Sequence, residues 1–302
     1  MSIWGNGIEV HDIRKVPGSD REFFKKRWVQ VHGAFRVLES DWVELTEAAR
    51  QRIRIKAVGL HAGTAMIVGK AAGELWRLWI LDTRYPIELS YPKNRAVPPK
   101  HQWKPGVKYR RMHVPREDWL EWKGIRLTTL ERTVIDICRF ESFAQGLAAV
   151  ESYLKKGNCA KALYSTWSQI GNLHGKKKFL KVMKWAGDTS ESAGESLAKA
   201  LMIEAGIDMS KVQQNPEVVV NGKTYRVDFL YDSWLTIEIN GEEKYQGKYG
   251  DPITIMRNER RREEDFLNDG YSRISTNWAD MHSGKFIHLL KKRIAERRGT
   301  PK

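Results

Sequence analysis

Cysteine is scarce in this sequence, which has only Cys138 and Cys159 among its 302 residues. Cys138 lies in an apolar helical pattern, and Cys159 lies in a loop-like run after two lysines and a glycine. Two distant thiols exclude a disulfide framework and the ligand spacing of a structural zinc site. Such a composition is typical of a reducing compartment, and we expect a cytoplasmic protein.

Long hydrophobic runs are also missing. No stretch approaches the roughly 20 apolar residues that a membrane-spanning helix needs. The first residues lack a charged segment followed by an apolar run, so we expect neither export nor membrane insertion. A chain of 302 residues is about twice the usual length of one domain, which predicts two or three compact units.

Acidic residues are outnumbered, with 37 Asp and Glu against 52 Lys and Arg and a formal net charge of +15. The basic residues cluster and are interleaved with 12 Trp and 10 Tyr. This pattern is typical of proteins that bind a phosphate backbone. DNA is the partner that it favours and RNA also fits, whereas the alternative is a basic surface that serves solubility alone.

The first part predicted from the pattern covers residues 1–45, with a short helix, a basic helix from Arg21 to Arg27 and two strands joined at Gly33. That order resembles a reduced winged helix, whose basic helix would offer Lys25, Lys26 and Arg27 to nucleic acid. The alternative is a small packing subdomain with a solvated basic helix.

The second part covers residues 46–187 and should be largely helical. Helices are expected at 47–58, 64–78, 142–154, 160–170 and 179–185, with strands and turns between 81 and 114. Thr128 and Glu131 form the pattern of a capping box, and Arg132 and Asp136 would share a face of the helix that follows. Candidate phosphate contacts in this part are Arg110, Arg111, Lys176, Lys177 and Lys178.

The third part, residues 188–302, holds the candidate chemistry. A helix over 192–206 carries Glu195, and Asn221-Gly222 predicts a tight hairpin followed by a strand over 224–231. If residues 232–234 form a three-residue loop, Tyr231 pairs with Leu235. Asp228 then lies directly opposite Glu238, whereas a two-residue loop would place the two on different faces.

Opposed carboxylates about 4.5–5.5 Å apart repel each other, and a divalent cation removes that conflict. Hard oxygen ligands suit Mg²⁺ or Mn²⁺, either of which can polarise a phosphodiester and activate water. Asn240 ends the strand beside them, and Lys244 follows as a cation within reach. The alternative is that both acids are ordinary polar residues paired with Arg226 or Lys244.

A basic helix is predicted downstream. Arg257, Arg260, Arg261 and Glu264 recur at helical spacing, with Met256, Phe266 and Leu267 on the other face and Gly270 at the end. The arginine face is a candidate phosphate track. A solvated helix face balanced by neighbouring glutamates is the alternative.

Several motifs of the third part follow one another in an order that resembles the Vsr-like branch of the PD-(D/E)XK nucleases. They are Glu195-Ser196, Gln214-Asn215-Pro216, Val227-Asp228-Phe229, Ile237-Glu238-Ile239-Asn240-Gly241, 261–265 and Ser275-Thr276-Asn277-Trp278. The front part, from Trp28-Val29-Gln30-Val31-His32-Gly33 to 127–136, resembles the regulator antitoxins of abortive-infection type IV toxin–antitoxin systems.

The nuclease resemblance implies that Asp228, Glu238 and the Ile239 carbonyl bind the metal, and that Glu195 completes the shell or holds a water. Asn240 stands where the general nuclease motif has a lysine, and Lys244 or Arg261 would replace that cation. The fold implied is mixed α/β (α+β): a winged-helix-like N-terminal part, a mixed helical middle domain and a C-terminal restriction-endonuclease-like sheet flanked by helices.

Three functions follow from these observations. The preferred one is an Mg²⁺-dependent DNA endonuclease or nickase, and the antitoxin resemblance adds a role in phage defence. The second is a DNA-binding regulator or antitoxin with an inactive nuclease fold and a cognate toxin as partner. The third is a repair enzyme that nicks at mismatches, for which no base-reading residue can be named.

Overall fold

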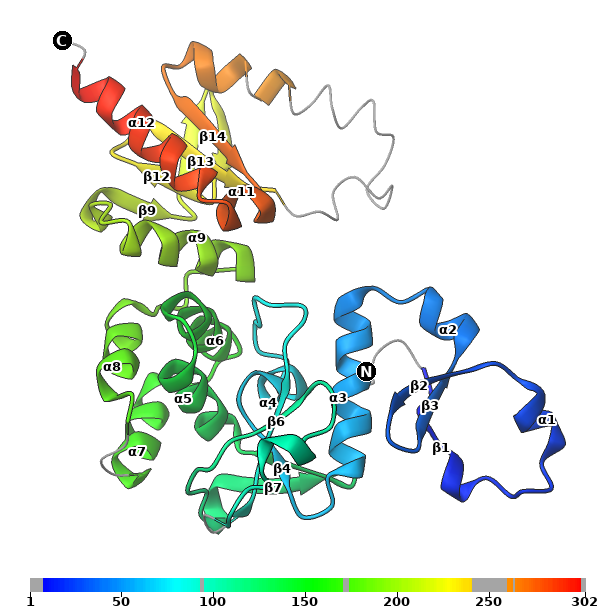
Figure 1. Cartoon of the computed structure of the whole chain (residues 1–302). Coiled ribbons are helices and arrows are strands. Elements are labelled where there is room, and N and C mark those ends of the chain that lie inside the picture. Colours follow the sequence, from blue (N-terminus) through cyan, green and yellow to red (C-terminus); the bar gives the residue numbers. More distant parts are fainter. Residues whose placement is uncertain (1–7, 93–94, 171–173, 241–259, 263, 300–302) are drawn as a thin grey trace. The chain divides into compact units, whose positions relative to one another are not determined.

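The computed structural model of the protein has a mixed α/β fold in two compact units. The structure describes residues 8–92, 95–170, 174–240, 260–262 and 264–299. Unit 1 comprises the chain up to Lys184 except for residues 154–156, and unit 2 comprises those three residues and the chain from Trp185 onward (Figure 1). The sequence predicts this boundary after residue 187.

Unit 1 begins with a small three-stranded antiparallel sheet in the order β1-β3-β2. Its elements are β1 (His11–Asp12), a 3-10 turn (Ile13–Lys15), α1 (Arg21–Lys25), β2 (Trp28–His32), β3 (Phe35–Leu38) and α2 (Glu39–Val43). Gly33 has a φ of 54° at the β2–β3 turn, as expected. The first expected helix is only a 3-10 turn, and α1 ends before Lys26. A winged helix stays a prediction.

A second, five-stranded sheet forms the centre of unit 1, in the order β6-β5-β4-β8-β7. Its strands are β4 (Met66–Ile67), β5 (Ile87–Ser90), β6 (Val107–Tyr109), β7 (Trp119–Trp122) and β8 (Ile125–Thr128). The helices of this unit are α3 (Glu47–His61), α4 (Gly69–Leu75), α5 (Leu130–Phe140), α6 (Phe143–Lys155), α7 (Ala160–Ile170) and α8 (Lys176–Trp185). Buried aliphatic side chains of α3, α4 and the sheet form one core.

Three local predictions for unit 1 differ from the structure. Of the helix expected over 64–78, only Gly69–Leu75 is helical, as α4. Met66–Ile67 form strand β4, because Ile67 pairs with both Leu89 and Leu127, and Gly69 has a φ of 59° where the helix begins. Thr128 does not cap α5; it ends β8, and its hydroxyl lies 2.6 Å from that of Thr133. The run of three lysines forms the first turn of α8 rather than preceding it.

The shared face of Arg132 and Asp136 is confirmed, and it is buried. Arg132 has no exposed surface. Its Nε donates to the Asp136 carboxylate at 2.8 Å, and its Nη1 donates to Asp118. A buried arginine needs such partners, since an unpaired charge in a core is costly. This ion cluster explains the pattern as part of the structure of unit 1.

Unit 2 has a four-stranded mixed sheet in the order β14-β13-β12-β9, with only β13 and β14 parallel. Its elements are α9 (Ala193–Glu204), β9 (Val212–Gln214), β10 (Glu217–Val220), β11 (Lys223–Arg226), β12 (Phe229–Tyr231), β13 (Leu235–Ile239), β14 (Ser272–Thr276), α11 (Trp278–His282) and α12 (Lys285–Gly299). Residues 260–262 and 264–268 are helical. Helices α11 and α12 pack beside α9 and β14 (Figure 1).

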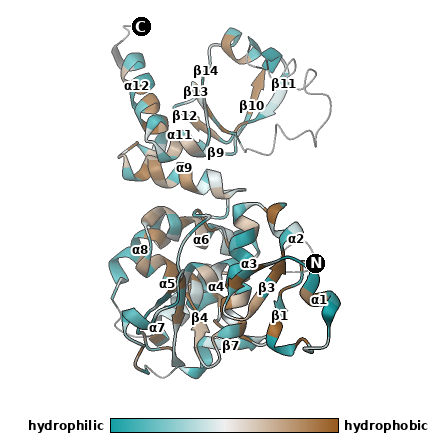
Figure 2. Cartoon of the chain, turned by 45° about the vertical axis from the view of Figure 1, so that its right-hand side comes forward, coloured by the Kyte–Doolittle hydropathy of each residue, from teal (hydrophilic) through white to brown (hydrophobic). Residues whose placement is uncertain are grey.

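The β10–β11 hairpin has the expected two-residue turn, with Asn221 at a φ of 49° and Gly222 at 72°. Val218 and Val220 are buried, and β10 carries largely hydrophobic colouring in Figure 2. The strand expected over 224–231 is divided. β11 pairs only with β10, and β12 belongs to the main sheet, so the chain changes sheet at Val227 and Asp228.

Candidate active site

The register of β12 and β13 brings Asp228 and Glu238 to the same end of the sheet. Tyr231 pairs with Leu235 and Phe229 with Ile237, which confirms the three-residue loop. Asp232 and Ser233 make that loop with φ values of 50° and 60°. One further step along both strands places Asp228 opposite Glu238. The carboxylates thus come from neighbouring positions although β12 itself begins one residue later.

Asp228 acts as the end cap of β12. Its Oδ2 accepts a hydrogen bond of 2.6 Å from the backbone N–H of Ile239, the residue after Glu238. A side chain therefore satisfies a strand donor where the partner backbone has left the ladder. This contact holds the Asp228 carboxylate within one residue of Glu238 along β13.

Glu238 is 8% exposed and forms an ion pair that the sequence does not predict. Arg262 donates from Nη2 to its Oε1 at 2.6 Å and to the Arg226 carbonyl at 3.0 Å. The guanidinium lies over the rings of Tyr225 and Phe266, 5.5 and 5.7 Å from their centroids. The sequence feature that could have indicated this ion pair is the spacing of Arg262 and Phe266, which are one helical turn apart.

The predicted face of this helix needs correction. Phe266 is buried, as expected, whereas Leu267 is 58% exposed. Arg260 and Arg261 are exposed, and Arg260 pairs with Glu264 at 3.1 Å. Arg257 lies outside the described residues.

Glu195 is connected to Asp228 through Asn215. Asn215 Nδ2 donates to Glu195 Oε2 at 2.9 Å, and its backbone N–H donates to the Asp228 carbonyl at 2.9 Å. The same Glu195 carboxylate accepts from the Glu191 N–H and the Ser192 hydroxyl, both at 2.9 Å. Both carboxylate oxygens of Glu195 therefore accept hydrogen bonds from residues just before the start of α9.

These contacts place Glu195 beside the two acids rather than among them. Within the described part of the chain, no three His, Cys, Asp or Glu side chains lie close enough to hold a metal ion. Asp228 and Glu238 remain the candidate pair. Glu195 supports their end of the sheet from a second position.

Asn240 does not open toward the carboxylates as expected. Its Nδ2 donates to the Ser275 hydroxyl at 2.7 Å, and its N–H donates to the Thr276 carbonyl at 2.8 Å. The parallel pairing of β13 with β14 explains both contacts, because Ile239 lies opposite Thr276. Lys244, the expected cation, lies outside the described residues.

The donor chemistry at this end of the sheet fits a hard divalent cation. Asp228, Glu238 and the Ile239 carbonyl supply only oxygen, the ligand type that Mg²⁺ and Mn²⁺ prefer. Two buried polar atoms close by, Arg262 Nε and Thr276 Oγ1, have no hydrogen-bond partner among the described residues. Buried polar atoms without partners are uncommon and often mark a position that a ligand or water completes.

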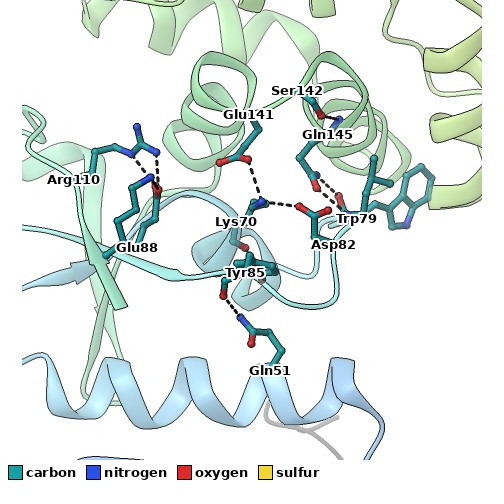
Figure 3. A network of polar contacts seen from close by, with 12 residues as sticks. Gln51, Lys70, Trp79, Asp82, Tyr85, Glu88, Arg110, Glu141, Ser142 and Gln145 are labelled. Atoms are coloured by element: carbon teal, nitrogen blue, oxygen red, sulfur yellow. Dashed lines mark hydrogen bonds and ion pairs between the residues drawn. The ribbon is translucent and has the colours of Figure 1, made fainter. Parts of the chain in front are cut away.

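The other predicted phosphate contacts differ in whether their side chains are exposed or already paired with an acid. Arg110 donates two hydrogen bonds of 2.8 and 2.7 Å to Glu88 (Figure 3). Its guanidinium also lies 4.0 Å from the Phe140 ring centroid. Glu88 therefore neutralises Arg110, and a phosphate contact by Arg110 stays a prediction. Arg111 is exposed.

The lysine runs remain exposed. Lys25 pairs with Glu22 at 2.6 Å on the surface, and Lys26 and Arg27 follow it before β2. Lys178 donates to the Glu141 carbonyl at 3.1 Å, whereas Lys176 and Lys177 extend from the first turn of α8. Their role in binding nucleic acid stays a prediction.

Comparisons with known proteins add no family. No family model matches the chain, and searches of curated proteins and of solved structures found no match. Among the described residues, none of the helices has the length and apolar character to cross a membrane.

Proposed function

We propose that the chain is a metal-dependent nuclease that hydrolyses phosphodiester bonds of DNA, with Asp228 and Glu238 as the metal ligands. The observation that carries this proposal is the register of β12 and β13, which brings these acids together at one sheet end. The mixed sheet flanked by helices agrees with the expected PD-(D/E)XK fold. The net charge of +15 supports a polyanionic substrate.

Each residue of the site has a role in this proposal. Mg²⁺ or Mn²⁺, when bound, supplies positive charge to the reacting phosphate and activates water. Asp228 and Glu238 hold the ion, with the Ile239 carbonyl as a third oxygen donor. Asn215 ties Glu195 to the backbone of Asp228 and keeps that strand end in place. Arg261 is exposed on the adjacent helix and can contact a phosphate.

Two observations favour a second function, a DNA-binding regulator whose nuclease-like centre is inactive. Arg262 already neutralises Glu238 at 2.6 Å, and Asn240, where the general motif has lysine, is bound to Ser275. In such a protein the arginine replaces the metal ion as the counter-charge of the acid. An antitoxin role with a cognate toxin belongs to this second function, whereas a role in phage defence belongs to the nuclease.

A plasmid-nicking assay separates the two. Supercoiled plasmid is incubated with the full chain and Mg²⁺ or Mn²⁺, and relaxed circles are counted over time. We expect Asp228→Ala and Glu238→Ala to lower the rate by roughly 10²–10⁴-fold, since a metal contributes several kcal/mol to such a reaction. Glu217→Ala, an exposed acid of the same unit, is the matched control and should leave the rate unchanged.

Intact plasmid with either metal, together with a gel shift by the same preparation, would establish the regulator instead. Equal nicking by the wild type and both alanine variants would also reject the proposed site.

A further inference from the structure

A basic stretch without acidic residues follows β5 in unit 1. Residues 91–116 include eight lysines and arginines and no aspartate or glutamate. Within it, β6 forms one edge of the five-stranded sheet. The stretch therefore combines positive charge with a sheet edge, in the unit that does not contain the candidate active site.

Three aromatic side chains meet there, and we name Tyr91, Trp103 and Tyr109 the aromatic platform. The Tyr91 and Tyr109 rings are stacked, with centroids 5.8 Å apart and planes at 15°. Trp103 lies 6.0 Å from Tyr109, and its indole N–H donates to the Pro98 carbonyl at 2.8 Å, which fixes the ring. All three side chains are partly exposed.

The charges beside the platform fall into two groups. Lys108 and Arg110 are neutralised by Glu88, at 2.9 and 2.7 Å. Lys100, Lys104 and Arg111 are exposed and have no ion pair with any residue that the structure describes. Uncompensated cations thus lie within three residues of Trp103 or Tyr109.

Core packing accounts for only part of this arrangement. Tyr91 and Tyr109 cover the core cluster with part of their surface. Packing does not require the exposed part of the rings or the cations that are close to them in the sequence, and the Arg95 guanidinium lies 5.1 Å from the Tyr91 centroid. Partly exposed rings with unpaired cations close to them in the sequence are a combination that single-stranded nucleic acids use, because bases stack on rings and phosphates attract lysine.

We infer that the aromatic platform, with Lys100, Lys104 and Arg111, binds single-stranded DNA. Unstacked bases lie against the rings, and the three cations contact the backbone. A duplex keeps its bases inside the stack and could use only the charges, so it should bind more weakly. This inference does not depend on the hydrolysis proposed for unit 2.

Fluorescence anisotropy with the full chain tests the inference in EDTA, where metal-dependent cleavage cannot contribute. The probes are a labelled oligothymidylate of about 16 nucleotides and a duplex of equal length. Trp103→Ala should weaken binding of the single strand roughly tenfold through loss of stacking, and Trp103→Phe should retain most of it. Glu217→Ala, the exposed acid of unit 2 that serves as the control for nicking, should bind as the wild type does.

The charge contribution is measured by Lys100→Gln against Lys161→Gln, a matched exposed lysine on α7. Loss of one phosphate contact should lower the slope of log affinity against log salt by about 0.7, a change that altered folding would not produce. Lys161→Gln should leave the slope unchanged. Identical slopes for the two variants, unchanged binding by a folded Trp103→Ala, or tighter binding of the duplex would each overturn the inference.

Discussion

Arg262 and Glu238 form the contact on which the two functions proposed for unit 2 differ. In a nuclease the arginine must yield the carboxylate, at least in part, when the metal binds. In a regulator it is the permanent counter-ion. The side chain of Arg262 is 27% exposed and that of Glu238 10% exposed, so removal of the arginine leaves a largely buried acid without this partner.

Arg262→Gln should therefore lower the free energy of unfolding in EDTA by about 1–2 kcal/mol, reduced from the cost of a fully buried pair by partial exposure. If the site binds metal, saturating Mn²⁺ should recover part of that loss, because the ion replaces the missing charge. Urea unfolding with and without Mn²⁺ measures both quantities. A loss of the same size in both conditions would favour the regulator, and Arg260→Gln is the exposed control.

Asn215 has a conformational and a bonding role that two substitutions separate. Its φ is 54°, and its Nδ2 donates to the Thr189 carbonyl and to Glu195. Asn215→Gly keeps the backbone conformation and loses the hydrogen bonds, whereas Asn215→Ala loses both. We expect the alanine variant to be less stable than the glycine variant by about 1 kcal/mol in urea unfolding. Equal stabilities would show that the left-handed backbone is not strained there.

Glu88 gives unit 1 a dependence on pH. Burial raises the pKa of Glu88, but hydrogen bonds from Arg110 and Lys108 outweigh it, so the pKa lies below its ordinary value. Because the pKa is lowered in the folded state, the ionised Glu88 stabilises unit 1 fully at pH values above its ordinary pKa. That stabilisation is lost as the pH falls through the lower pKa of the folded state. Glu88→Gln should cost about 1–2 kcal/mol of unfolding free energy at neutral pH, and its difference from wild type should narrow as pH falls from neutral to below the ordinary pKa of glutamate. A constant difference in chemical unfolding across that range would contradict the assignment.

At the level of elements, the turn between β12 and β13 fixes the register that the site requires. Asp232 and Ser233 both have positive φ, a conformation that costs free energy for every residue with a Cβ atom. Ser233→Gly should raise the free energy of unfolding by roughly 0.5–1 kcal/mol, because relief of this strain exceeds the added flexibility of glycine. Ser233→Ala should give no such gain in thermal unfolding, and equal effects of the two variants would exclude strain as the cause.

Elements with strong local signals could be predicted from the sequence, and those set by distant partners could not. Asn221-Gly222 encodes its own turn. The sequence left two registers for β12 and β13, and the structure has the one in which a three-residue loop pairs Tyr231 with Leu235. Met66 and Ile67 form a strand only because distant strands pair with them. A period-based reading favours a helix for such short apolar segments, since tertiary pairing decides their conformation.

The same distinction applies to the candidate site. Asp228 and Glu238 follow from strand alternation and loop length, which are local properties. Arg262 reaches Glu238 from a helix 24 positions later. Asn215 lies 20 positions after Glu195 and also contacts the backbone of Asp228. Contacts over such separations depend on how helix and sheet pack, and residue spacing does not encode them. The sequence therefore predicted the two acids, but it did not predict that Arg262 pairs with Glu238 or that Asn215 binds Glu195.

The whole molecule combines two units with separate hydrophobic cores, and each proposal assigns one ligand to one of them. Calorimetry of the full chain should thus show two unfolding transitions. Glu88→Gln should lower only the transition temperature of unit 1, and Arg262→Gln only that of unit 2. The two variants therefore show which transition belongs to which unit. In EDTA, the oligothymidylate should raise the first transition, whereas Mn²⁺ alone should raise the second.

A ligand at about 100 times its Kd stabilises the unit that binds it by about 2.7 kcal/mol, enough to separate shifted and unshifted transitions. Trp103→Ala should abolish the shift by the oligothymidylate and keep the shift by Mn²⁺, and Asp228→Ala should do the reverse. If both ligands moved the same transition, one unit would carry both sites, and the division of binding and hydrolysis between two cores would be wrong.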